Sequence, residues 1–209
     1  MAQYSCDAIV FFGATGDLAF KKIFPALQKL ARRRKLEMPV IGVAKSGWQL
    51  QQLEERAKDS VETYGGVDPE AFAKLISRLQ YIDGDYSDPG TFSKLRQHLG
   101  PSQHPLHYLA IPPVLFPEVV KQLSASGCAT GGRVVIEKPF GHDMASAHTL
   151  NEIVHGAFAE EDVFRIDHFL GKNTVKMCCI SGLPIRTSNQ FGIVSMFQSV
   201  QITMAEDFG

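Results

Sequence analysis

The sequence has little of what marks secreted, zinc-binding or membrane proteins. It has four cysteines and no Cys-x-x-Cys pair, which argues against a disulfide framework and against the usual spacing of a zinc site. No apolar run approaches the roughly 18 residues that a membrane-spanning helix needs. We therefore expect no metal site and no membrane partner. The cysteines are Cys6, Cys128, Cys178 and Cys179.

An excess of positive charge is also missing. The 21 Lys and Arg residues are balanced by 22 Asp and Glu residues, and the net charge of −1 argues against non-specific binding to nucleic acid. The first seven residues are polar, and the apolar run 8–12 is too short for a secretory signal. A cytoplasmic, reducing location is the simplest interpretation.

Short apolar segments alternate with amphipathic segments over the first 140 residues. Continuous apolar runs suit strands that are buried on both faces of a parallel sheet. Their alternation with helices predicts an α/β fold with a Rossmann-like doubly wound parallel sheet, in which ligands bind at the carboxyl ends of the strands. The strands are expected at 8–12, 40–43, 79–82, 106–110 and 133–136, and the helices at 16–34, 49–64, 68–79, 92–99 and 116–126.

The pattern changes after Pro139. Residues 144–160 predict one long amphipathic helix, and we expect a second unit to begin there. The sequence is therefore divided into a dinucleotide-binding domain over 1–142 and the start of another domain over 143–209.

The turn Gly13-Ala14-Thr15-Gly16-Asp17-Leu18 lies between the first strand and the first helix. Gly13 lets the chain turn sharply, and Gly16 has no side chain to block a pyrophosphate on the helix N-terminus. The alternative is a plain strand-to-helix turn with Asp17 as its cap, because the usual third glycine is absent.

The end of the second strand bears on the choice of coenzyme. A carboxylate there would hold the ribose 2′-hydroxyl of NAD. Lys45 and Ser46 stand there instead, and they could receive the 2′-phosphate of NADP. The alternative is a solvated loop lysine.

Two further motifs carry groups suited to a sugar phosphate. Lys138 follows the fifth strand in Glu137-Lys138-Pro139, where it could hydrogen-bond a sugar hydroxyl or a phosphate, or form a strand-end salt bridge. In the run 165–172, His168 and Lys172 offer two donors for a phosphate. Asp167 could orient a catalytic histidine, or could form a structural pair with its neighbour.

The sequence resembles glucose-6-phosphate dehydrogenase in three motifs and in their order and spacing: Gly-Ala-Thr-Gly-Asp-Leu-Ala, Glu-Lys-Pro-Phe-Gly and Arg-Ile-Asp-His-Phe-Leu-Gly-Lys. The ending 200–206 also resembles this family. The resemblance implies that 143–209 begins an incomplete α+β substrate domain. It also implies hydride transfer from C1 of glucose 6-phosphate to NADP, giving 6-phosphoglucono-lactone, in the oxidative pentose phosphate pathway.

The resemblance assigns a role to each matched residue. Gly13, Gly16, Asp17, Leu18 and Lys22 would line the coenzyme turn, Lys45 would hold the 2′-phosphate, and Lys138 would contact both the reacting sugar and the coenzyme. His168 and Lys172 would hold the 6-phosphate, Asp167 would pair with the catalytic histidine, and Glu206 would contact the sugar. Lys45 stands where the family commonly has arginine, and Phe169 where it commonly has tyrosine.

The family's catalytic histidine matches no position up to Gly209, so the resemblance implies that this chain is inactive. Members of the family form homo-oligomers. Two alternatives remain: an NADP-binding remnant without catalysis, and another NADP-linked sugar oxidoreductase of the Glu-Lys-Pro type.

One stretch, 176–198, does not fit the resemblance, although the distance from Lys172 to Val200 does. Gly182 and Pro184 would break the helix that the family has there. Residues 180–197 can be translated back into permissible codons. When these codons are read in a frame shifted by two bases, they encode the family's Phe-Arg-Phe-Ala-Asn and Trp-Asn-Arg. We infer a lost base near Val175 and a gained base near Gln198.

Overall fold

A computed structural model describes residues 6–141 and 143–166 of the chain. These residues form one compact unit that extends to Ile166. The strands are β1 (Ala8–Phe12), β2 (Val40–Ala44), β3 (Leu79–Asp83), β4 (Pro105–Leu109), β5 (Arg133–Glu137) and β6 (Val163–Ile166). The α-helices are α1 (Phe24–Arg32), α2 (Leu50–Tyr64), α3 (Pro69–Arg78), α4 (Pro89–Leu99), α5 (Phe116–Ala125) and α6 (Met144–His155). A π-helical segment, Ala19–Ile23, leads into α1, and the 3₁₀ turns are Pro113–Leu115 and Glu160–Asp162.

The six strands form one parallel sheet in the order β3-β2-β1-β4-β5-β6. This is the Rossmann order, and the fold predicted from the sequence is confirmed. The strand order reverses at the central pair β1 and β4: β2 and β3 follow on the side of β1, and β5 and β6 follow on the side of β4. At this point Phe12 of β1 lies beside Val43 of β2 and Leu109 of β4. The carboxyl ends of these three strands therefore lie next to one another.

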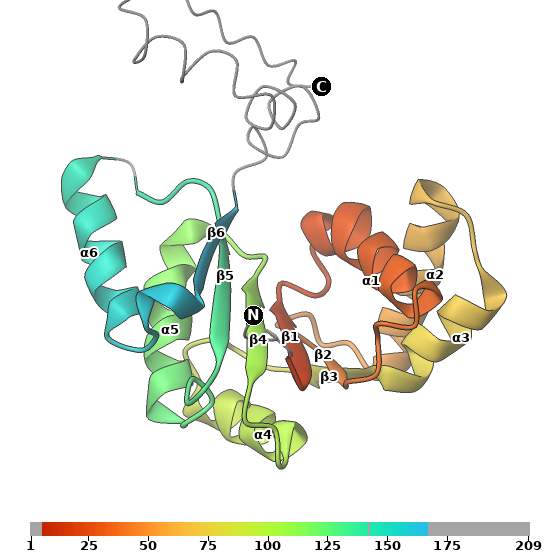
Figure 1. Cartoon of the computed structure of the whole chain (residues 1–209), viewed down its shortest axis with the longest axis horizontal. Helices are drawn as coiled ribbons and strands as arrows, with labels where there is room; N and C mark the ends of the chain where they lie inside the picture. The colour runs from red at the N-terminus through yellow and green to blue at the C-terminus, as the bar shows by residue number, and fades with distance from the viewer. Residues whose placement is uncertain (1–5, 142, 167–209) are drawn as a thin grey trace, which may run out of the picture. The chain divides into compact units, whose positions relative to one another are not determined.

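Helices cover both faces of the sheet, as Figure 1 shows with α1, α2 and α3 on one side and α4, α5 and α6 on the other. Each face has its own apolar core. Phe11, Phe24 and Leu53 belong to the core on the α1–α3 side, and Phe12 and Phe116 belong to the core on the α4–α6 side. Phe11 and Phe12 are neighbours in β1 and point to opposite faces, as the period of two in a strand requires.

Aspartates set the first residues of three helices. The side chains of Asp68, Asp88 and Asp143 accept hydrogen bonds from backbone amides in the first turns of α3, α4 and α6. The helix expected at 92–99 begins earlier, at Pro89, because Asp88 is its cap and proline suits the first helical position.

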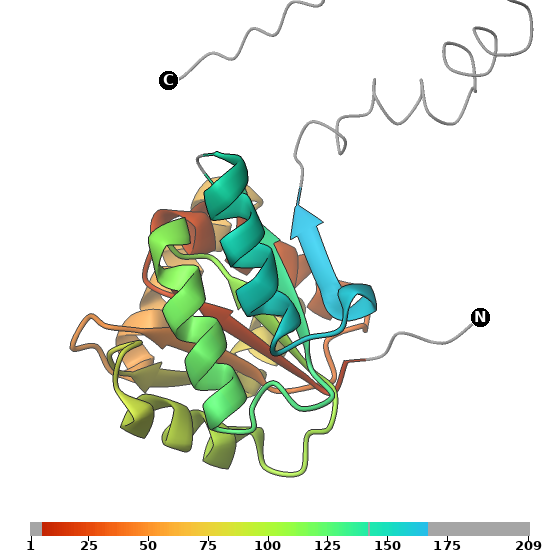
Figure 2. The same cartoon turned by 90° about the vertical axis from the view of Figure 1, so that its left-hand side faces the viewer.

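Residues 144–166 differ from the expected single long helix. The helix α6 ends at His155, before Gly156, and the chain then returns through Glu160–Asp162 to form β6, which pairs in parallel with β5. In Figure 2, α4, α5 and α6 lie side by side in front of the sheet, with β6 at its edge. The contacts therefore place 143–166 in the same unit as the sheet, whereas the sequence pattern placed the start of a second domain at 143.

No helix within the described ranges is long and apolar enough to cross a membrane.

Candidate functional site

The sheet brings most of the described candidate residues to one edge. Gly13 follows β1, Lys45 follows β2 and Lys138 follows β5, each at the carboxyl end of its strand. Three strand spacings separate β2 from β5, which corresponds to about 14 Å. The edge is therefore long enough for an extended ligand that reaches from Lys45 across the glycine turn toward Lys138.

Gly13 occupies a position that only glycine can take. Its φ of +79° lies in the left-handed region, and a Cβ atom there would lie 2.2 Å from the backbone oxygen of Ala110, just after β4. The chain can therefore turn out of β1 while its backbone stays close to the end of β4. This agrees with the sharp turn expected from the sequence.

Tyr86 holds this turn from a distant part of the chain. Its hydroxyl accepts a hydrogen bond from the Gly13 amide (2.8 Å) and donates one to the carbonyl oxygen of Val43 (3.1 Å). Its ring packs edge-on against Phe12, with 5.7 Å between the ring centroids. Burial raises the pKa of Tyr86 to about 12, so the hydroxyl keeps its proton. The sequence did not point to Tyr86 as part of the site. The local pattern that could have drawn attention to it is the Asp-Gly-Asp-Tyr run at the end of β3.

The glycine turn leaves amides for an anion. The Gly16 amide bonds the Gly13 carbonyl oxygen (2.9 Å), while the amides of Thr15, Asp17 and Leu18 bond no other residue in the described part of the chain. These amides lie at the start of the helical segment that leads into α1, where the helix dipole favours negative charge.

Asp17 does not cap this segment, which begins without a side-chain cap. Its carboxylate pairs instead with Lys21, one turn on, at 3.3 Å. Lys22 is exposed on the same turn. The five residues predicted for the coenzyme turn thus lie close together, because they belong to one turn and the helix that follows it. They are Gly13, Gly16, Asp17, Leu18 and Lys22.

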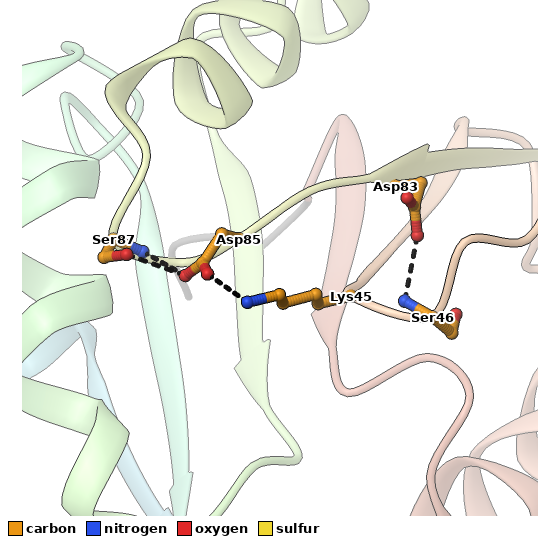
Figure 3. A network of polar contacts seen from close by, with 5 residues as sticks. All are labelled: Lys45, Ser46, Asp83, Asp85 and Ser87. Atoms are coloured by element: carbon orange, nitrogen blue, oxygen red, sulfur yellow. Dashed lines mark hydrogen bonds and ion pairs between the residues drawn. The ribbon is translucent and has the colours of Figure 1, made fainter.

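The end of β2 carries a charge network that the sequence did not reveal (Figure 3). The Lys45 ammonium lies 2.6 Å from a carboxylate oxygen of Asp85, which follows β3. This hydrogen bond and the carboxylate charge raise the pKa of Lys45 and hold the pKa of Asp85 well below its usual range. Lys45 is thus an exposed loop lysine, as in the alternative interpretation, but it is paired with a carboxylate.

A second carboxylate supports the same loop. The side chain of Asp83, the last residue of β3, accepts hydrogen bonds from the amides of Ser46 (2.9 Å) and Gly47 (2.8 Å). It also accepts one from the Tyr81 hydroxyl (3.1 Å). These amide bonds hold the pKa of Asp83 below its usual range. The parallel pairing of β2 with β3 brings these residues together.

The end of β5 is polar, and an apolar groove lies beside it. Glu137 is buried and accepts a hydrogen bond from the Tyr108 hydroxyl of β4. Burial, and then this hydrogen bond, raise the pKa of Tyr108 above its usual range. Lys138 is exposed. The groove has a volume of about 350 Å³ and is lined by Pro113, Val114, Pro117, Pro139, Gly141, Ser146, Thr149 and Leu150.

Arg165, the first residue of the third motif, is described near the end of β6. Its guanidinium pairs with Glu160 (2.9 Å) and donates a hydrogen bond to the Asn151 side chain (3.0 Å). It thus ties β6 to α6 and to the turn between them. Four site residues predicted from the sequence lie outside the described residues: Asp167, His168 and Lys172 of that motif, and Glu206 near the C-terminus. The stretch 176–198 also lies outside them.

The described ranges contain no group of three or more His, Cys, Asp or Glu side chains placed to hold a metal ion. The polar groups of this edge are instead a glycine turn with available amides, a lysine paired with a carboxylate, and a second lysine.

A parallel sheet of this order, with a glycine turn at its switch point and ligand groups at its carboxyl edge, defines a dinucleotide-binding domain of the Rossmann type. Residues 10–177 match the family model described as "Glucose-6-phosphate dehydrogenase, NAD binding domain". The chain belongs to this family, which is a family of oxidoreductases with a nicotinamide coenzyme. The resemblance found in the sequence is thus confirmed.

Relatives and solved structures agree. The chain is 37% identical over 203 residues to "Glucose-6-phosphate 1-dehydrogenase 1" of Mycobacterium tuberculosis, a match that covers 97% of this chain and 44% of the relative. It is 37% identical over 219 residues to the enzyme of Saccharomyces cerevisiae, with 96% of this chain and 43% of the relative covered.

Among solved structures, the glucose-6-phosphate 1-dehydrogenase of Mycobacterium avium superposes with a TM-score of 0.76 at 43% identity, over 79% of this chain and 36% of that one. A glucose-6-phosphate dehydrogenase in complex with glucose-6-phosphate gives a TM-score of 0.77 at 32% identity, over 90% of this chain and 42% of that one. The chain therefore spans less than half the length of the relatives described here.

Proposed function

We propose that this chain is the coenzyme-binding part of a glucose-6-phosphate dehydrogenase that uses NADP. The reaction is the transfer of hydride from C1 of glucose 6-phosphate to the coenzyme, which gives 6-phosphoglucono-lactone as the first step of the oxidative pentose phosphate pathway. Family membership supports the substrate and the reaction, and the end of β2 supports the choice of coenzyme.

The glycine turn fits the pyrophosphate of a dinucleotide. A Cβ atom at Gly13 would collide with the backbone of Ala110, so the turn can keep its shape only with glycine. The amides of Thr15, Asp17 and Leu18 are available to an anion at the start of the helix, and Lys22 adds a positive charge nearby. When bound, the nicotinamide of the coenzyme accepts the hydride.

Lys45 is the single observation that carries the preference for NADP. It lies at the carboxyl end of β2, where an NAD-specific domain has a carboxylate for the ribose 2′-hydroxyl. Its ammonium is exposed to an approaching ligand, and its charge complements a 2′-phosphate. Ser46 is the next residue and presents a hydroxyl on the same loop.

The substrate end of the site is assigned to the edge beyond β5. Lys138 contacts both the reacting sugar and the coenzyme and orients the C1 carbon, as a cationic donor to the sugar hydroxyls. Asp167 is the partner of the histidine that removes the C1 hydroxyl proton, and the 6-phosphate is held by His168 and Lys172. Glu206 contacts the sugar ring. These last four assignments rest on the matched motifs.

Trp48 allows the choice of coenzyme to be tested without turnover. It is the only tryptophan of the chain, and it lies three residues beyond Lys45 on the same loop. We expect its fluorescence to report a lower Kd for NADP than for NAD. Lys45→Gln should weaken NADP about tenfold or more, because a charge-assisted contact to the phosphate is lost, and should change the Kd for NAD less than twofold.

Lys58→Gln is the matched control. It removes the same charge from the exposed side of α2, where Lys58 pairs with Glu62. It should leave both affinities unchanged. If Lys45→Gln weakens NADP no more than Lys58→Gln does, Lys45 is not the 2′-phosphate ligand and the preference for NADP has no basis in this site.

A further inference from the structure

The lysine proposed to receive the 2′-phosphate is already held by a carboxylate. Lys45 and Asp85 lie 40 positions apart and form a direct ion pair at 2.6 Å (Figure 3). The Lys45 side chain is 71% exposed and that of Asp85 is 40% exposed. A ligand phosphate can therefore reach this pair from solvent, and it must compete with the carboxylate when it does.

Asp85 is held in the orientation that makes this pair. Its Oδ1 atom accepts hydrogen bonds from the Ser87 amide (2.9 Å) and the Ser87 hydroxyl (2.8 Å). This leaves Oδ2 to face Lys45. The carboxylate is therefore part of a turn that its own chain stabilises, and it does not depend on Lys45 for its position.

The surrounding loop adds negative charge at the same place. Asp83 engages the amides of Ser46 and Gly47, which are the backbone donors next to Lys45. In the described structure, the loop after β2 thus has one lysine, one carboxylate that pairs with it, and a second carboxylate bound to the backbone of the next two residues. A 2′-phosphate brings further negative charge to this spot, whereas the 2′-hydroxyl of NAD does not.

We propose that Asp85 limits the preference for NADP over NAD by competing with the 2′-phosphate for the Lys45 ammonium. NADP binds when Lys45 leaves Asp85, so part of the new contact replaces an existing one. NAD binds with the Lys45–Asp85 pair intact. Asp85 acts through Lys45 and is a positioning residue for coenzyme specificity. The inference rests on the proposed NADP function.

The decisive variant is Asp85→Asn in the 209-residue chain. Asparagine keeps an oxygen that accepts the Ser87 hydrogen bonds but removes the charge that holds Lys45. We expect the Kd for NADP, measured by Trp48 fluorescence, to fall about three- to fivefold, the range that exposed ion pairs allow. The Kd for NAD should change less than twofold.

Asp88→Asn is the matched control. Asp88 lies three residues beyond Asp85, caps α4 through the Gly90 amide and makes no contact with Lys45. Asparagine caps a helix as well as aspartate does, so this variant removes one nearby charge and nothing else. Both Kd values should stay within twofold of the parent chain. An equal gain in NADP affinity from Asp88→Asn would overturn the proposal in favour of a general charge effect.

The double variant separates competition from direct repulsion. In the Lys45→Gln background, Asp85→Asn should change the Kd for NADP less than 1.5-fold, because there is no ammonium left to release. If the three- to fivefold gain persists there, or if Asp85→Asn alone weakens NADP, the competition is overturned. The proposed NADP function fails on a different result, namely that the parent chain binds NADP no better than NAD and Lys45→Gln has no effect.

Discussion

Single side chains at the coenzyme edge are positioned by partners that lie far away in the sequence. The Gly13 amide is held by Tyr86, 73 positions on, and Lys45 is held by Asp85, 40 positions on. The second contact joins the ends of the neighbouring strands β2 and β3, and the first reaches from the end of β3 past β2 to the end of β1, so the sheet itself brings the partners together. A substitution at one of these positions therefore changes the coenzyme site through geometry as well as through the group that it removes.

His107 in β4 is a buried histidine whose protonation bears on stability. It is fully buried, and its Nε2 atom donates to the carbonyl oxygen of Cys128 (2.9 Å). Its Nδ1 atom has no hydrogen-bond partner among the described residues. A second proton at Nδ1 would place an unpaired charge in the core, and burial therefore lowers the pKa of His107 to about 4.

We predict that the protein loses stability between pH 7 and pH 5 because of this histidine. The unfolded chain binds the proton below about pH 6.5 and the folded chain only near pH 4, so stability is complete above the unfolded pKa and falls as the pH is lowered. The loss should be about 2 kcal/mol at pH 5. Urea unfolding at the two pH values measures it.

The comparison needs two variants. His107→Gln should be less stable at pH 7 but should lack this part of the pH dependence. His98→Gln, which removes a histidine that hydrogen-bonds Gln80 at the surface, should keep it. An identical pH dependence in His107→Gln and the parent chain would show that burial does not lower the pKa of His107.

At the scale of secondary-structure elements, α6 and β6 complete one face of the sheet. Leu150 and Val154 of α6, Phe158 in the following turn and Val163 of β6 are all buried in the core on the α4–α6 side. β6 also pairs with β5 along the edge that faces away from β4. Without these elements, β5 would become an exposed edge strand next to an uncovered apolar face.

A fragment of residues 1–166 is therefore expected to fold cooperatively, and a fragment of residues 1–141 is not. The shorter fragment loses the burial of four large side chains, a loss of about 5 kcal/mol or more, which is comparable to the whole stability of a small domain. Thermal unfolding followed by circular dichroism, together with binding of an apolar dye, compares the two. Equal melting temperatures would place the boundary of the domain at 142 after all.

At the scale of the whole molecule, the described unit carries the residues proposed to bind the coenzyme at the ends of β1, β2 and β5. The glycine turn, Lys45 and Lys138 all belong to the unit that extends to Ile166. Four of the histidines in this unit make structural contacts, with Gln80, Gly131, Cys128 and Glu160 as partners. The proposed reaction also needs a base at the C1 hydroxyl.

We predict that the 209-residue polypeptide binds NADP but does not reduce it with glucose 6-phosphate. The resemblance assigns the catalytic base to none of the seven histidines of this sequence, and a general base must come within hydrogen-bond reach of the proton that it removes. The absorbance of reduced NADP measures turnover, and the fluorescence of Trp48 measures binding in the same sample. Turnover at a rate normal for such enzymes would mean that one of these histidines is the base.

Local patterns were enough to predict the five strands β1 to β5 and the glycine turn after β1. The runs 8–12 and 133–136 are apolar at nearly every position, because both faces of these strands are covered, and a pattern of this kind needs no knowledge of partners. The observed strands begin or end within one residue of the expected bounds. The Gly13–Gly16 turn was equally readable, because its conformation is a property of glycine itself.

Only the tertiary structure revealed β6 and the charge network at Lys45. β6 has four residues, and it is a strand because β5 offers a free edge beside it. Asp83 and Asp85 meet the Lys45 loop because β2 and β3 pair in parallel and end together. The sequence by itself determined the fold class and the family, since these depend on local patterns. Which charges surround Lys45 depends on contacts between distant segments, which form only when the sheet assembles.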